Sequence, residues 1–124
     1  LPALVFTKTD NEDGYLDAIE IQDLILKNSN VILSACETFS EIETESEPFS
    51  GLIKSFILAG AQSVMATRWE IESISASRFV SSYIGEISTS QNQSKAISKV
   101  QRSFIGSDDY SSPFYWAPYL SFEN

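Results

Sequence analysis

Two short apolar runs constrain the fold of this chain most strongly, because a segment of helical periodicity separates them. Residues 30–35 form a largely apolar run that ends in small residues. A nearly continuous apolar run of this length is typical of a strand that is buried on both faces. Ser63–Thr67 is a second run of this kind. Between them, the apolar residues of 49–57 recur three and four positions apart. This order predicts two parallel strands joined by a helical crossover.

The rest of the chain continues the alternation of strands and helices. Residues 3–6 predict a strand followed by a polar turn over 9–14, and the last strand is expected over 119–122. Helical spacing predicts one helix over 16–25, which Asp17 or a neighbour could start, and two more over 74–84 and 96–104. We therefore expect one α/β domain over residues 1–124, with helices on both faces of a mostly parallel sheet.

Composition excludes several classes of function. The formal charge of −9 disfavours nucleic acids and anionic membranes as main partners, and no apolar run approaches the length of a membrane-spanning helix. A single cysteine cannot form an internal disulfide, which favours a reducing, cytoplasmic location. With one cysteine, no histidine and only isolated glycines after the first helix, neither a zinc site nor a phosphate-binding loop is expected. We expect no metal and no cofactor.

The lone cysteine is the main candidate for chemistry. Free cysteines are most often buried core residues, but Cys36 follows its apolar run instead of lying within it. In open α/β sheets, functional residues lie just beyond the carboxyl ends of the strands. This position favours a nucleophilic thiol at the edge of a groove.

The segment around this cysteine resembles the nucleophile segment of the CHAT peptidases, caspase-like domains often attached to tetratricopeptide repeats. The segment is residues 30–38, with the sequence NVILSACET. Four further blocks resemble the family in the same order, at 13–21, 56–64, 68–71 and 113–119. The similarity therefore extends through the whole chain.

The resemblance implies a caspase-like three-layer sandwich, of which this chain would be the C-terminal part. It also implies a cysteine endopeptidase in which Cys36 works with a histidine base, and in which backbone N–H groups hold the oxyanion. The family's histidine precedes the segment matched here. The chain has neither an initiator methionine nor a histidine, so we expect it to be a piece of a longer protein. By itself it would have little activity, and the parent could also carry an upstream tetratricopeptide region.

Acidic residues near the second apolar run suggest the substrate. Glu70 and Glu72 follow Ser63–Thr67, so they are expected at the same sheet edge as Cys36. In relatives such as separases, an acidic residue of this region receives a basic side chain before the scissile bond. We therefore expect Glu72 or Glu70 to bind such a side chain, although both could be solvated loop residues. Trp69 is interpreted as a wall of the same cleft, with a core position as the alternative.

Two other functions are compatible with parts of the pattern. The first is a catalytically inactive caspase-like scaffold, which would keep the fold and use its cleft to bind proteins. The second is a small response-regulator-like or nucleotide-binding module, which is disfavoured because no phosphate loop or acidic cluster follows the strands. A histidine-glycine pair upstream of the chain would favour the enzyme over the scaffold.

Overall fold

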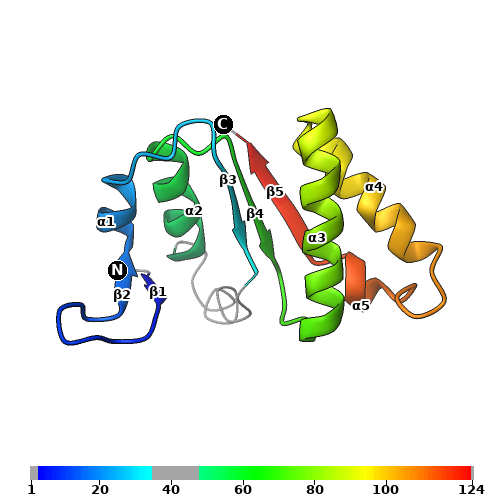
Figure 1. The fold of residues 1–124 in the computed structure, drawn as a ribbon, viewed down its shortest axis with the longest axis horizontal. Helices are drawn as coiled ribbons and strands as arrows, with labels where there is room; N and C mark the ends of the chain where they lie inside the picture. Colours follow the sequence, from blue (N-terminus) through cyan, green and yellow to red (C-terminus); the bar gives the residue numbers. More distant parts are fainter. Residues whose placement is uncertain (1–2, 35–47, 124) are drawn as a thin grey trace.

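The structure, a computed structural model, describes residues 3–34 and 48–123 and has α/β architecture. A central sheet separates α1 and α2 on one side from α3 and α4 on the other (Figure 1). No helix among the described residues combines the length and apolarity needed to cross a membrane. In chain order, the elements are β1 (Ala3–Val5), β2 (Tyr15–Asp17), α1 (Ala18–Gln22), β3 (Asn30–Leu33), α2 (Pro48–Leu58), β4 (Ser63–Thr67), α3 (Ser73–Ser90), α4 (Gln93–Ile105), α5 (Pro113–Trp116) and β5 (Tyr119–Glu123).

The central sheet has the strand order β3-β4-β5. β3 and β4 are parallel, with Asn30 opposite Ser63 and Leu33 opposite Ala66. β5 pairs antiparallel to β4, so the predicted final strand is present and runs against its neighbour. The predicted crossover from β3 through α2 to β4 is thereby confirmed, and the α/β fold class with it.

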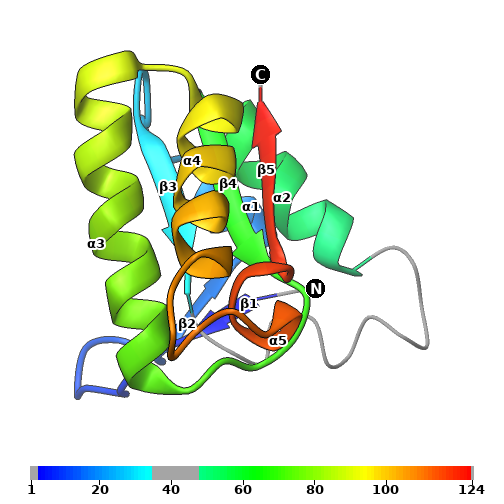
Figure 2. The same cartoon turned by 90° about the vertical axis from the view of Figure 1, so that its right-hand side faces the viewer.

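β4 is the centre of the molecule, because all five of its residues are buried. Successive side chains of a strand point to opposite faces of a sheet. Val64 and Ala66 accordingly join a core with α1 and α2, while Met65 joins a second core with α3, α4 and β5. Figure 2 shows α3 and α4 lying against one face of the sheet, with α1 and α2 behind it. The result is a three-layer arrangement with one core on each face.

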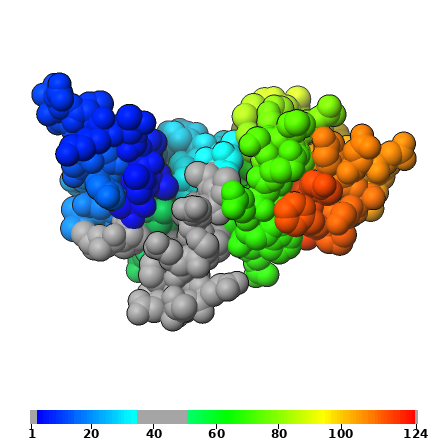
Figure 3. All heavy atoms as spheres, turned by 90° about the horizontal axis from the view of Figure 1, so that it is seen from below, coloured from blue at the N-terminus to red at the C-terminus, as the bar shows by residue number. Residues whose placement is uncertain are grey.

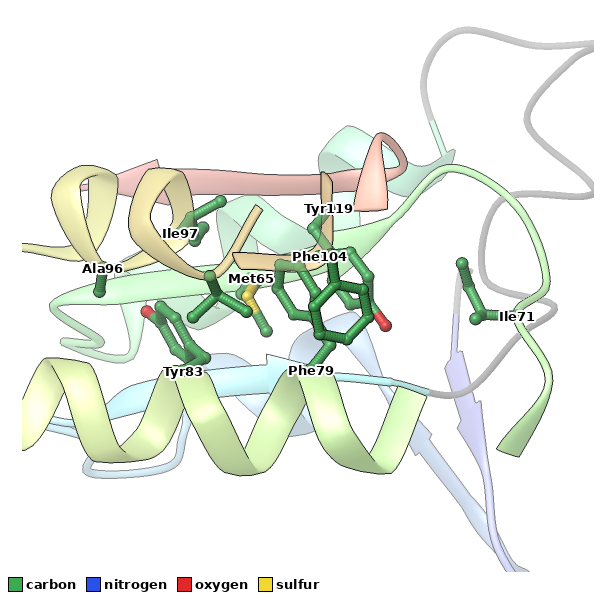
Figure 4. Close-up of a cluster of buried hydrophobic side chains, with 9 residues drawn as sticks. Met65, Ile71, Phe79, Tyr83, Ala96, Ile97, Phe104 and Tyr119 are labelled. Carbon is green, nitrogen blue, oxygen red and sulfur yellow. The ribbon is translucent and has the colours of Figure 1, made fainter. Parts of the chain in front are cut away.

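The second core is built around aromatic rings (Figure 4). The fully buried Phe79 ring stacks on Tyr119, with 3.6 Å between the ring centroids. It also meets the edge of Phe104, at a centroid distance of 5.2 Å. These contacts join α3, α4 and β5 into one layer on the sheet.

A hydrogen-bonded side chain ties α4 to the strands at the opposite end of the sheet. Asn30 Oδ1 accepts a hydrogen bond from Ser63 Oγ at 2.6 Å and another from Gln93 Nε2 at 2.9 Å. Ser63 and Gln93 are buried, so each polar group needs such a partner. Asn30 therefore fixes the first residue of α4 against β3 and β4.

The N-terminal region differs from the sequence prediction. Residues 15–17, predicted to enter a helix, form β2 and pair antiparallel with β1, with Leu4 opposite Leu16. Asp17 then caps a short α1 by accepting hydrogen bonds from the N–H groups of Ile19 and Glu20, both at 2.9 Å. The predicted helix start at Asp17 is therefore confirmed, whereas the predicted extension to residue 25 was wrong, because α1 ends at Gln22.

The bounds of the other helices and strands differ less from the sequence prediction. The third helix, α3, continues to Ser90, beyond the predicted limit at 84, and only Gln91 and Asn92 separate it from α4. The short helix α5 was not predicted, although a proline at its first position is a known signal for a helix start. The strands predicted over 3–6, 63–67 and 119–122 are confirmed within one residue at each end.

Replacing Phe79 by alanine should destabilise the protein by about 3–5 kcal/mol, because the change leaves a cavity between Tyr119 and Phe104. Ile84 lies on the same helix but is exposed, so Ile84→Ala provides a matched control with a small effect. Urea denaturation of both variants measures the difference. Equal destabilisation by the two substitutions would contradict the aromatic core described above.

Candidate functional site

The parallel strands place two connections at one edge of the sheet. Leu33, the last residue of β3, lies opposite Ala66 of β4, so both strands end at the same level. The chain that leaves β4 therefore begins beside the carboxyl end of β3. Cys36 follows β3 by three positions in the sequence. It lies outside the described residues, so its role as the nucleophile stays a prediction.

The segment after β4 is held in place by the end of the chain. The N–H of Arg68 donates a hydrogen bond of 2.9 Å to the carbonyl oxygen of Pro118, just before β5. Ile71 is buried in the second core. These two anchors leave Trp69 and Glu70 between them on the surface, at the sheet edge that the sequence predicted for them.

Trp69 contacts α5 through both its ring and its indole nitrogen. Its Nε1–H donates a hydrogen bond of 3.0 Å to the carbonyl oxygen of Phe114. The Trp69 and Phe114 rings stack with their centroids 6.5 Å apart. Their exposed fractions are 37% and 46%, so the pair presents aromatic surface to solvent. Trp69 is therefore a fixed surface residue and not a core residue, as its interpretation as a cleft wall requires.

The sequence did not identify Phe114 as the partner of Trp69. The two residues are 45 positions apart, and no periodicity relates them. Only the proline that starts α5 and the density of aromatic residues after it indicated an ordered element there. The contact depends on tertiary packing that brings α5 under the segment after β4.

Further aromatic rings pack in series against Phe114 of this pair. Phe114 meets the edge of Tyr115, which meets the edge of Tyr110, with centroid distances of 5.3 and 5.2 Å. The guanidinium carbon of Arg78 lies 5.7 Å from the centre of the Tyr110 ring. A cation over an aromatic face is attracted by the ring quadrupole. The series fixes α5 to α3 and thereby fixes the position of Phe114.

Glu72 has a structural task that the sequence did not predict. Its carboxylate is the N-cap of α3 and accepts hydrogen bonds from Ser75 N–H at 2.6 Å and Ile74 N–H at 3.2 Å. Hydrogen bonding by Ser75 is the largest of the causes that lower the pKa of Glu72 from its ordinary value of 4.5. Glutamate is not among the preferred N-cap residues, which is why no sequence rule indicated this role.

Glu70 differs from Glu72 in its surroundings. Its side chain is exposed, and within residues 3–34 and 48–123 the structure gives it no hydrogen bond or ion pair. It follows Trp69, one ring of the stacked pair, directly in the sequence. An aromatic face beside a carboxylate is a favourable environment for a basic side chain, through cation–π attraction and ion pairing. The part of the chain that is described contains no cluster of three histidine, cysteine, aspartate or glutamate side chains that could hold a metal ion.

Replacing Glu72 by alanine should lower the melting temperature at neutral pH, because the first N–H groups of α3 lose their acceptor. A lowered pKa in the folded state means that the charged carboxylate stabilises the fold. This contribution is complete above the ordinary pKa of 4.5 and is lost as the pH falls through the lower folded-state value. The difference between wild type and variant should therefore shrink on acidification.

Thermal unfolding followed by circular dichroism at several pH values checks this dependence. Glu70→Ala is the matched control, because it removes a neighbouring carboxylate that caps no helix. A constant difference between wild type and Glu72→Ala down to strongly acidic pH would contradict the capping role.

The comparisons with known proteins agree with the architecture. The family model described as "CHAT domain" matches residues 1–124, the whole chain. A search of curated proteins found no match. CHAT domains are related to caspase-like peptidases, and the α/β sandwich described above is compatible with that fold. The chain belongs to the CHAT domain family.

Proposed function

We propose that the protein of which this chain forms a part is a cysteine endopeptidase with Cys36 as its nucleophile. The observation that supports the proposal is the parallel register of β3 and β4. It brings the strand that precedes Cys36 to the same sheet edge as the segment 68–72, which carries aromatic and acidic side chains. Catalytic and ligand-binding groups of α/β sheets gather at such an edge.

The proposed reaction proceeds through a thioester. The histidine base, contributed by the upstream part of the parent, takes the proton of the Cys36 thiol, and the sulfur attacks the peptide carbonyl carbon. The C–N bond then breaks, and the amine product leaves with the proton from the histidine. Water hydrolyses the thioester and regenerates the thiol. A thiol needs this assistance because its ordinary pKa of about 8.5 leaves it mostly protonated at neutral pH.

The substrate proposed is a protein or peptide with a basic residue before the scissile bond. Glu72 or Glu70 would pair with this residue, and Trp69 would provide an aromatic wall beside it. A reducing cytoplasmic location would keep the lone cysteine as a free thiol. An upstream tetratricopeptide region of the same protein could present substrates to the cleft.

The second candidate is an inactive caspase-like scaffold, with which the absence of histidine from the 124 residues is equally compatible. The scaffold would use the same sheet edge to bind proteins without cleaving them. The two functions differ in what the parent protein does to a bound peptide, so a cleavage measurement separates them.

Replacing Cys36 by alanine in the full-length parent should abolish peptide cleavage while leaving the unfolding temperature unchanged. Cleavage is measured by mass spectrometry on a library of unstructured peptides. Alkylation of the wild-type parent with iodoacetamide should inhibit cleavage as well, and peptide mapping should find the label on Cys36, the single cysteine of residues 1–124. Full cleavage by the alanine variant would refute the nucleophile assignment, and a wild-type parent that cleaves nothing would favour the scaffold.

Pairs of peptides that differ only in arginine or aspartate before the scissile bond test the proposed pocket. We expect the arginine peptide to be cleaved faster, and Glu70→Gln or Glu72→Gln to reduce that preference by about tenfold. Asp108→Asn is the control, because Asp108 is an exposed carboxylate in the turn between α4 and α5. A preference for aspartate, or an equal loss in the control, would exclude this pocket.

A further inference from the structure

The exposed aromatic surface at Trp69 continues onto Phe114 of α5. The planes of the two rings differ by 23° in direction, and the ring centroids lie 6.5 Å apart. Nearly parallel rings at this separation are displaced sideways, so neither ring fully covers the face of the other. Both side chains are partly exposed. The two rings therefore form one continuous aromatic surface, which we call the ring pair.

Hydrogen bonds to the backbone of α5 hold the ring pair in place. The Trp69 indole donates its hydrogen bond to the carbonyl oxygen of Phe114. Gln101 Nε2 of α4 donates a hydrogen bond of 2.9 Å to the carbonyl oxygen of Trp116, the last residue of α5. Trp116 Nε1 in turn donates one of 2.9 Å to the carbonyl oxygen of Ser111. A surface that is ordered before binding loses little conformational entropy when a ligand covers it.

The ring pair lies at the sheet edge of the proposed active site. Tyr119, the first residue of β5, lies opposite Thr67, the last residue of β4. Because β5 is antiparallel to β4, it begins where β3 and β4 end, and α5 precedes it directly in the chain. Figure 3 views the molecule from this edge and shows α5 (orange-red) at the surface next to α3 (light green). Phe114 therefore belongs to the same edge as the end of β3, the strand that precedes Cys36.

We propose that Phe114 is a specificity-determining residue, which makes the proposed pocket prefer arginine to lysine before the scissile bond. The assignment rests on the proposed function, because it extends the pocket in which Trp69 forms one wall. The planar guanidinium group of arginine stacks on aromatic faces and is weakly hydrated, whereas the compact ammonium group of lysine is strongly hydrated. Two rings side by side offer the guanidinium group and its apolar stem a longer flat surface than the Trp69 indole alone.

The charge of the chain favours a cationic ligand on the ring pair over an apolar one. The formal charge is −9, and Glu70 and Glu72 follow Trp69 within three positions of the sequence. An apolar side chain would gain only from the aromatic area. Arginine would gain from the aromatic area and from the negative potential together.

Binding of short peptides to the full-length parent carrying Cys36→Ala tests the assignment, because this variant lacks the proposed nucleophile. The probes are acetylated and amidated pentapeptides of alanine whose central residue is arginine, lysine or norleucine. Isothermal titration calorimetry measures their dissociation constants. We expect the arginine peptide to bind more tightly than the lysine peptide, and Phe114→Ala to reduce this ratio of affinities by about fivefold. Phe114→Leu should have the same effect, because leucine provides apolar area without an aromatic face.

Two variants serve as controls for the loss of the ring. Phe114→Tyr should keep the preference for arginine, since it keeps the aromatic face. Phe122→Ala removes an exposed phenylalanine of β5 that lies opposite Val64, near the other end of β4, and should leave the ratio unchanged. Circular dichroism of each variant checks that the fold is kept. Equal affinities for arginine and lysine, tightest binding of norleucine, no measurable binding of the arginine peptide, or an unchanged ratio in Phe114→Ala would overturn the assignment.

Cleavage of the arginine peptide by the parent with its cysteine intact separates this assignment from the proposed function. Cleavage without any effect of Phe114→Ala on the ratio of affinities would support the peptidase and overturn the role of Phe114. Selective binding of arginine that depends on Phe114, without cleavage of any peptide, would support the ring pair and refute the peptidase.

Discussion

Burial of β4 on both faces is the constraint on which the rest of the structure depends. Its side chains alternate between two cores, with Val64 and Ala66 on one side and Met65 on the other. A shift of its register by one residue would exchange these sets and misplace both layers. Because β3 pairs with β4 in parallel and β5 pairs antiparallel on the other side, this register also sets where each neighbouring strand ends. The position of the candidate site follows from it.

The sequence predicted those elements whose burial pattern is local. β4 and α2 have continuous or helically spaced apolar residues, so their own residues indicate how they are buried. β2 was missed because its three residues are too few to show a period, and no short turn between it and β1 indicated an antiparallel pair. Leu24 and Ile25 supported a longer helix, but both are exposed beyond the end of α1. Apolar spacing alone cannot separate a buried face from an exposed one.

The sequence predicted where the candidate site residues lie along the chain relative to β4, but not which side chains they contact. The rule that functional residues follow parallel strands predicted Trp69, Glu70 and Glu72 just beyond the carboxyl end of β4, where the structure has them, and their part in a site stays a prediction. It could not show that Trp69 would bond to Phe114, because that contact depends on how α5 packs. It also could not show that Glu72 caps α3, a role that glutamate seldom takes. Cys36 lies outside the described residues, so its assignment as a nucleophile stays a prediction.

The capping role of Glu72 bears directly on which carboxylate would recognise a basic substrate side chain. Both oxygens of Glu72 accept backbone N–H groups, and the positive end of the α3 dipole offsets part of its negative charge. A carboxylate has further lone pairs, so Glu72 could still accept a hydrogen bond from a guanidinium group. Its attraction for that group is nevertheless weaker than that of an uncapped carboxylate at the same distance. Glu70, which follows Trp69 in the sequence, carries no such compensation among the described contacts, and this favours it for the proposed ion pair.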